Sequence, residues 1–194
     1  GTPESTLATL AVGQMARRLG LPFRAGGHYT ASKVTDAQAM QESADSMFPA
    51  FLAGANFIHQ AAGWLEGGLV VGYEKFILDS DRLGMLHRMG DGMIINENSL
   101  GLSAFKENSP GENFLGTEHT GENFETANFR SEIADNNSFE QWEEDGSKDA
   151  EERAYERWNA MLDEYVEPPM DLAIDEELKD FIRLKKDSMD DEWY

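Results

Sequence analysis

The sequence predicts an α/β fold built on parallel strands. Three observations support this class: apolar residues recur at helical spacing, short strand-like runs alternate with these helices, and each run ends in a polar turn. The order strand, loop, helix, strand, loop, helix favours parallel strands joined by crossover helices. An acidic, helical segment follows.

The first helix is expected from Pro3 to Gly20, because Pro suits a helix start and Gly a helix end. A short strand follows in "LPFRAGG", residues 21–27. Asp36 is a suitable N-cap for a second helix that reaches Gly54.

The second strand is expected at Asn56–Gln60, followed by a glycine-rich loop and a third helix from Tyr73 to Met89. A further helix is predicted at Glu97–Glu107. Asn113–Leu115 is interpreted as another short strand. Three or four strands cannot close a barrel of eight, so the sheet is open or the chain is part of something longer.

Beyond Ser131 the composition shifts to acidic helices, and this segment holds 22 acidic and 7 basic side chains of a chain whose net charge is −21. Such a surface repels phosphate, which argues against nucleic acid and anionic membranes as partners. Solubility or docking to a basic partner would explain the charge. The predicted helices of this segment are Phe139–Glu144, Lys148–Tyr165 and Asp175–Lys186.

The chain has no cysteine, which excludes a disulfide framework and thiolate chemistry and suits a reducing cytoplasm. The N-terminal residues lack the pattern of a secretory signal. Residues 46–65 carry no formal charge but include Pro49, His59 and Gln60, so a buried helix leading into a buried strand is expected there instead of a membrane span.

Three polar turns each carry a histidine directly after a predicted strand: "GGHYTASK" with His28, "HQAAGWLEGG" with His59, and "GTEHTGEN" with His119. Because the active sites of α/β proteins lie at the carboxyl ends of the strands, we expect the three histidines to converge on one site there. A metal site with Glu66 or Glu118 is an alternative, although no HxH or HExxH pair supports it. A second alternative is that each histidine has a purely structural role and is held by hydrogen bonds.

Aromatic and acidic side chains in the same turns indicate a site for an organic cation. Tyr29 and Trp64 offer ring faces and Glu66 offers a carboxylate, a combination that suits a quaternary ammonium group. Packing of Trp64 in the interior is the alternative.

The blocks "LAGANFIHQAAGWLEGGLVVGYEKFILD", "NFLGTEHTGENF" and "QWEEDGSKDAEERAYERWNAMLDEY" together resemble the C-terminal part of the trimethylamine methyltransferase superfamily. The resemblance implies the C-terminal half of a (β/α)8 TIM barrel with an acidic helical extension. Residues 1–130 would supply the last three to four βα units, and residues 131–194 would be an extension packed on the barrel.

The resemblance also implies transfer of a methyl group from a methylated amine to the cobalt of a corrinoid protein. The corrinoid, a cobalamin, would be carried by a separate partner, with no cofactor bound tightly by this chain. Trimethylamine enzymes carry pyrrolysine in the turn that aligns with residues 26–33, whereas this chain has ordinary residues there. It thus resembles members similar to glycine betaine methyltransferases, which act on quaternary amines. A cytoplasmic homo-oligomer is expected.

The predicted roles follow from these turns. Tyr29 and Trp64 would contact the cation, and Glu66 or Glu118 would balance its charge. A fragment inactive on its own, a non-catalytic acidic half-barrel that serves as an interaction module, and a metal-dependent hydrolase remain alternatives. The catalytic set is His28, His59, Glu66 and His119, and the substrate-binding set is Tyr29, Gln60, Trp64, Glu118 and Thr120.

Overall fold

The structure, a computed structural model, describes residues 1–189. The chain divides into two compact units, residues 1–160 and the residues from Met161 onward. The first unit contains all the strands among the described residues and most of the helices. The last five residues of the predicted acidic extension, 190–194, lie outside the described residues.

Helix α1 (Pro3–Leu19) begins and ends as its sequence predicts. The Thr2 side chain accepts a hydrogen bond from Ser5 N at 3.4 Å, and Pro3 occupies the first turn. Gly20 ends the helix with a left-handed backbone, φ +66°.

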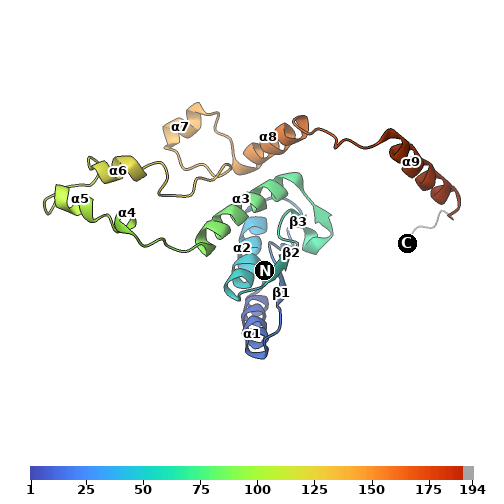
Figure 1. Cartoon of the computed structure of the whole chain (residues 1–194), viewed down its shortest axis with the longest axis horizontal. Coiled ribbons are helices and arrows are strands. Elements are labelled where there is room, and N and C mark those ends of the chain that lie inside the picture. The colour runs from blue at the N-terminus through green and yellow to red at the C-terminus, as the bar shows by residue number, and fades with distance from the viewer. Residues whose placement is uncertain (190–194) are drawn as a thin grey trace. The chain divides into compact units, whose positions relative to one another are not determined.

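Strands β1 (Arg24–Gly26) and β2 (Phe57–His59) pair in parallel, with helix α2 (Ala37–Leu52) as the crossover between them (Figure 1). Asp36 caps α2 by accepting from Ala39 N at 2.9 Å, as predicted. In the register, Gly26 lies opposite His59. The predicted strand–helix–strand unit is confirmed.

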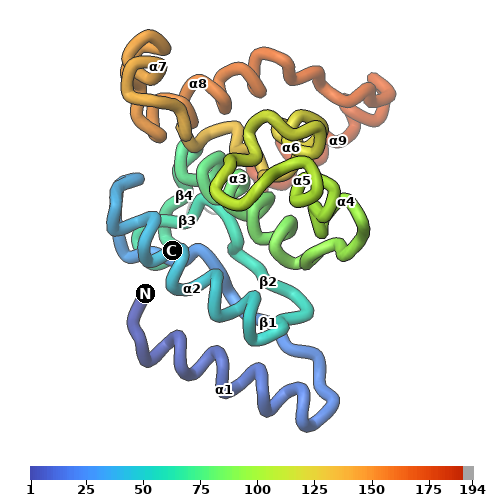
Figure 2. Tube along the Cα trace, turned by 90° about the vertical axis from the view of Figure 1, so that its left-hand side faces the viewer, coloured from blue at the N-terminus to red at the C-terminus, as the bar shows by residue number. Residues whose placement is uncertain are grey.

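Helices α2 and α3 (Tyr73–Gly90) lie on one face of this strand pair. A cavity of about 330 Å³ is lined by Met47 of α2, Ile58 of β2 and Leu83 of α3. Helix α1 lies alongside α2 (Figure 2), where Thr6 Oγ1 donates to the Asp45 carbonyl at 3.1 Å. No helix of the described residues is long and apolar enough to cross a membrane.

A small hairpin that the sequence analysis did not predict occupies the glycine-rich loop after β2. Strands β3 (Trp64–Leu65) and β4 (Val70–Val71) pair antiparallel, joined by the 3₁₀ turn Glu66–Gly68. Helix α3 starts at its predicted residue, Tyr73, with Gly72 as N-cap between it and β4, and ends within one residue of its predicted boundary.

Two predictions about residues 97–123 are wrong. Gly101, with φ +60°, divides the predicted helix into α4 (Glu97–Leu100) and α5 (Leu102–Glu107). The predicted strand Asn113–Leu115 is a turn, because the Asn113 side chain accepts from Leu115 N at 3.1 Å and Thr117 caps helix α6 (Glu118–Asn123) immediately afterwards.

The beginning of the acidic segment packs on α3 inside the first unit. Helix α7 (Phe139–Glu144) leads to α8 (Ala150–Asp163), whose buried Ala154 contacts a cluster with Ile77 and Ile133. Trp158 Nε1 donates to Glu74 Oε1 at 2.9 Å. Residues 131–160 thus belong to the same compact unit as residues 1–130.

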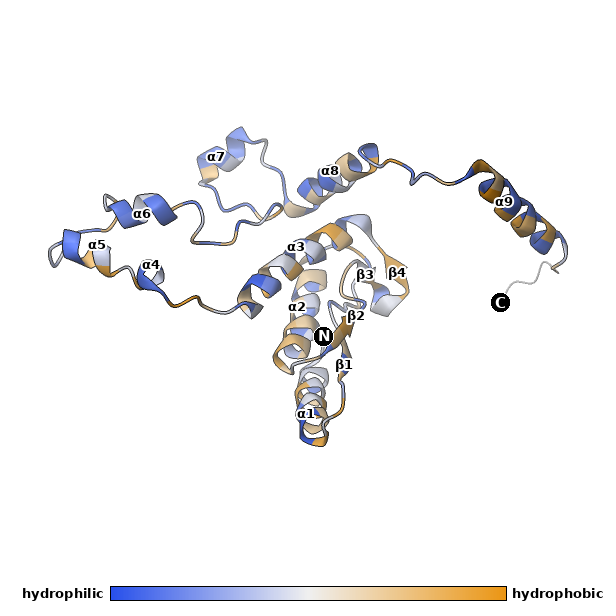
Figure 3. Ribbon diagram, viewed as in Figure 1, coloured by the Kyte–Doolittle hydropathy of each residue, from blue (hydrophilic) through white to orange (hydrophobic). Residues whose placement is uncertain are grey.

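The second unit contains α9 (Leu172–Asp187), which Asp171 caps by accepting from Ala173 N at 2.8 Å. The helix is amphipathic, and Figure 3 shows apolar and polar residues alternating along it. Its apolar side chains, including Phe181 and Ile182, are exposed.

The described residues form two sheets of two strands each. The parallel β1–β2 pair has the order and direction that a (β/α) unit requires. Its place in a half-barrel stays a prediction.

Candidate functional site

One face of the β1–β2 pair is free of the two helices. Successive side chains along a strand point to opposite faces, and Ile58 points toward α2 and α3. Phe57 and His59 therefore lie on the other face. His59 is half-buried, and its ring centroid lies 6.5 Å from that of Phe57. We call this surface the open face.

Tyr29 lies over the end of strand β1 on the open face. A methyl group at Gly26, the register partner of His59, would overlap the Tyr29 ring. Glycine at this position is therefore what allows the ring to lie against the strand. The ring is half-buried, so part of it remains accessible.

The turn of the β3–β4 hairpin reaches the same place. The position that a Cβ atom would take at Gly68 is 3.9 Å from Tyr29 Cε1 and 4.0 Å from Gln60 Nε2. Gln60, which follows β2, and Glu66 both have left-handed backbones, with φ of +54° and +50°. A left-handed conformation is costly for residues other than glycine and persists only where surrounding contacts impose it.

The loop after β1 supplies contacts that impose this turn. Glu66 N donates to the Ser32 carbonyl at 2.8 Å, and Gly67 N donates to the Thr30 carbonyl at 2.8 Å. The Glu42 carboxylate of α2 in turn accepts from Ala31 N at 2.7 Å and from Thr30 Oγ1 at 2.8 Å. These two hydrogen bonds lower the pKa of Glu42.

Trp64 and Leu65 are adjacent in β3 and point to opposite sides of the hairpin. Leu65 is buried and faces α3, since its Cδ1 lies 3.2 Å from the position of a Cβ atom at Gly72. Trp64 therefore faces away from α3 and is half-buried. Glu66, also half-buried, begins the turn that follows.

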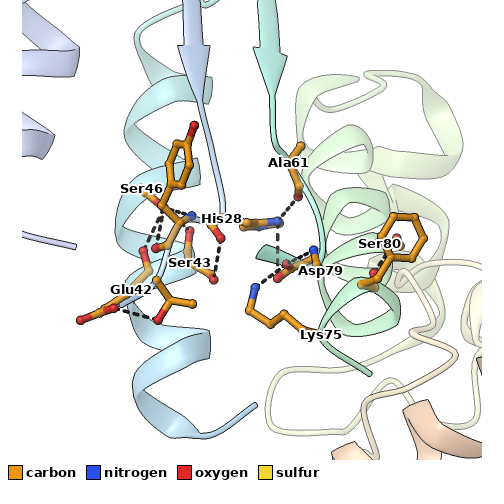
Figure 4. A network of polar contacts seen from close by, with 12 residues as sticks. His28, Glu42, Ser43, Ser46, Ala61, Lys75, Asp79 and Ser80 are labelled. Carbon is orange, nitrogen blue, oxygen red and sulfur yellow. Dashed lines mark hydrogen bonds and ion pairs between the residues drawn. The ribbon is translucent and has the colours of Figure 1, made fainter. Parts of the chain in front are cut away.

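His28 lies in a buried polar network behind the open face (Figure 4). Its backbone is left-handed, with φ +51°, and its Nδ1 lies 2.5 Å from the Ala61 carbonyl oxygen, which makes Nδ1 the protonated nitrogen of a neutral ring. Nδ1 is also 3.6 Å from Asp79 Oδ1, and Asp79 Oδ2 accepts from Lys75 Nζ and, at 2.9 Å, from Gly63 N.

Burial shifts the ionisation of this network. The removal of His28 from water lowers its pKa, partly offset by the nearby Asp79 carboxylate, and Lys75 and Arg82 add smaller lowering effects. Burial also lowers the pKa of Lys75, with Asp79 opposing the change. His28 is therefore neutral at physiological pH.

The third predicted turn forms a separate group. His119 lies in α6, and its Nε2 is 2.6 Å from the Asn98 carbonyl oxygen of α4. Thr120 Oγ1 donates to the Phe114 carbonyl at 2.7 Å, and Glu118 N donates to Glu107 at 3.2 Å. No hydrogen bond, ion pair or ring contact within residues 1–189 joins these side chains to the open face.

The expectation that three histidines share one site is corrected in two ways. His119 follows no strand in the described part of the chain, because Asn113–Leu115 form a turn. His28 does follow β1 beside His59, but its left-handed backbone directs the ring toward α3, whereas His59 lies on the open face. The residues that do converge on the open face are Tyr29, Gln60, His59 and the turn after Trp64.

Within residues 1–189 no group of three or more histidine, aspartate or glutamate side chains is arranged to hold a metal ion.

Three charged residues that organise the loops were not predicted from the sequence: Glu42, Lys75 and Asp79. Lys75 and Asp79 were detectable, since with Leu86 they follow the helical spacing of the buried side of α3. Charged residues at interior positions of a helix indicate a buried polar network.

Comparisons with known proteins give a consistent result. A family model described as trimethylamine methyltransferase (MTTB) matches residues 1–190. A glycine betaine methyltransferase of Desulfitobacterium hafniense strain Y51 is 35% identical over 182 residues, which cover 94% of this chain and 38% of that protein.

Trimethylamine methyltransferases are also similar. MttB of Desulfitobacterium hafniense strain DCB-2 is 29% identical over 187 residues, covering 96% of this chain and 37% of that protein. MttB1 of Methanosarcina mazei is 30% identical over 181 residues, which cover 92% of this chain and 36% of that protein. The chain thus spans well under half the length of these relatives.

Proposed function

Since the chain belongs to the trimethylamine methyltransferase (MTTB) family, we propose that it is part of a methyltransferase and contributes the open face to binding of a methylated amine. The observation that carries this proposal is the meeting of Tyr29, Gln60 and the Gly68 turn beside His59. These groups lie at the carboxyl ends of two parallel strands, where α/β proteins bind their ligands.

The substrate class that we propose is a quaternary amine with a carboxylate, as in glycine betaine. The relative at 35% identity is named for this substrate. A quaternary ammonium group has no N–H to donate, so its recognition depends on aromatic faces and nearby negative charge. Tyr29 and Trp64 supply the rings, Glu66 supplies the charge, and Gln60 and His59 supply polar contacts for the carboxylate.

The chemistry requires little of the protein beyond orientation. When the methyl C–N bond breaks, the electron pair stays on nitrogen and the product is a neutral tertiary amine, so no proton must be supplied. A corrinoid carried by a separate protein would provide the nucleophilic cobalt that accepts the methyl group. The residues of the open face would hold the amine in one orientation and exclude water, without a general acid.

The neutral state of His28 fits this scheme. A protonated imidazole behind the open face would oppose binding of a cationic amine, and burial keeps this ring uncharged. We therefore assign His28 a positioning role, because it is fully buried and bonded to Ala61.

The proposed half-barrel also has consequences for assembly. A pair of parallel strands leaves one unpaired edge on each strand, and Phe57 is exposed on the open face. Unpaired edges and apolar faces are covered in stable proteins, so we propose that the chain forms homo-oligomers. The exposed apolar side of α9 offers a second surface for a protein partner.

Titration calorimetry with glycine betaine tests the amine site. Its carbon isostere 3,3-dimethylbutyrate has the same shape and carboxylate but no cationic nitrogen, and it should bind at least about threefold more weakly, the ratio expected from loss of a cation–π contact. Glu66→Gln should weaken betaine binding, and Glu118→Gln, the matched change in α6, should not. Equal affinity for the two ligands would contradict the proposal.

A further inference from the structure

The Lys75–Asp79 pair is buried to a degree that stability alone does not explain. Both side chains are 0% exposed, and they lie one turn apart on α3. Removing two charges from water costs several kcal/mol per ion, and apolar side chains of similar volume often stabilise a protein as well or better. The carboxylate therefore has another use.

Asp79 joins three segments that the open face depends on. Its Oδ2 accepts from Lys75 Nζ and from Gly63 N at 2.9 Å, and its Oδ1 lies 3.6 Å from His28 Nδ1 (Figure 4). His28 in turn bonds the Ala61 carbonyl. One carboxylate of α3 thus bonds the start of the loop after β2 and lies beside the His28 ring of the loop after β1.

Gly63 is the residue at which this contact acts on the hairpin. Its backbone has φ +85°, and a Cβ atom there would lie 3.0 Å from Val71 Cγ1. Trp64 follows directly, and Glu66 two residues later. The orientation of the Gly63 amide, which Asp79 holds at the base of the hairpin, therefore contributes to the direction of both side chains, together with the Ser32 and Thr30 carbonyls that hold the turn at Glu66.

We infer that Asp79 is a positioning residue for amine binding, which orients Trp64 and Glu66 by holding the Gly63 amide. This inference rests on the proposed function. Lys75 serves to balance the charge of Asp79 within the buried network, and the hydrogen bond to Gly63 is the contact that matters for the ligand.

Two double variants separate these roles. K75M/D79N removes both charges but keeps a side-chain oxygen that can accept from Gly63 N. K75M/D79L removes the charges and the acceptor. The control, D175L/K179M, makes the same change in an exposed pair with the same spacing on α9, where Lys179 Nζ lies 2.5 Å from Asp175 Oδ2.

Glycine betaine affinity and amide proton NMR are the measurements. We expect K75M/D79N to bind within about threefold of the unmodified chain, and K75M/D79L to bind at least about tenfold more weakly, since small misplacements of binding groups have effects of this size or larger. The Gly63 amide and Trp64 indole resonances should move in K75M/D79L and stay in place in D175L/K179M.

The results that overturn the inference are distinct from failure of the proposed function. If K75M/D79L is folded and binds like K75M/D79N, Asp79 does not position the site. Slow exchange of the Gly63 amide in K75M/D79N would show that its hydrogen bond to residue 79 is kept. If this variant nevertheless binds betaine weakly, the inference is overturned. If K75M/D79L does not fold, this result for K75M/D79N decides the question. If the unmodified chain does not bind betaine, the proposed function fails. The Trp64 indole resonance then tests the role of Asp79. A shift of this resonance in K75M/D79L supports positioning of Trp64 by Asp79, and an unchanged resonance overturns it.

Discussion

Replacing Lys75 by methionine should destabilise the first unit strongly. The substitution preserves most of the side-chain volume but leaves the Asp79 carboxylate, which is 0% exposed, without its cation. Breaking a buried ion pair by removing one partner costs about 3–5 kcal/mol, because the remaining charge is uncompensated. Gly63 N still donates to Asp79 Oδ2, which favours the lower end of this range.

Chemical and thermal unfolding, followed by circular dichroism, measure this cost. A loss of about 3 kcal/mol should lower the melting temperature by about 6–12 °C for a chain of this size. K75M/D79N should recover most of the loss, because no unpaired charge remains. Lys179→Met, in the pair with Asp175 on the surface of α9, should leave the melting temperature almost unchanged, because solvent screens the charges of this pair.

Equal effects of Lys75→Met and Lys179→Met would contradict an unpaired buried charge as the cause. A K75M/D79N variant no more stable than Lys75→Met would contradict it too, since the cost would then come from packing instead of charge.

Three further predictions concern pH, the open face and assembly. His28 has a lowered pKa in the folded chain, so the unfolded chain binds the extra proton, and the free energy of unfolding should fall as pH drops below about 6.5, by at most about 1.4 kcal/mol per pH unit. Denaturant titrations between pH 5 and about 7 should show a shallower dependence for His28→Gln. Gly26→Ala should displace the Tyr29 ring and weaken betaine binding measured by calorimetry, whereas Gly116→Ala, which has open space around it, should not. Sedimentation velocity should show self-association. A strictly monomeric species would contradict the proposal that other copies of the chain cover the unpaired strand edges.

The sequence predicted the first unit well where local signals agree. Both ends of α1 and the start of α2 follow from Pro3, Gly20 and Asp36, which act through the backbone nearby. The β1–β2 pairing followed from the order of elements. The hairpin of Trp64–Leu65 with Val70–Val71 was missed because its strands have two residues each, too short for a periodic pattern.

The predictions for the site were less successful because they assumed that position after a strand determines direction. His28 follows β1 as expected, but a left-handed φ turns its ring into the interior. Phe114 and Leu115 are apolar, as in a short strand, yet the Asn113 side chain and the Thr117 cap favour a turn. These outcomes depend on side-chain hydrogen bonds that a single sequence does not specify.

A ¹H–¹⁵N NMR titration with glycine betaine would show directly whether the open face binds a methylated amine. We expect saturable shifts at the backbone of Tyr29, His59, Gln60 and Gly68 and at the Trp64 indole. Shifts confined to the acidic helices α8 and α9, or no shifts at millimolar ligand, would contradict it.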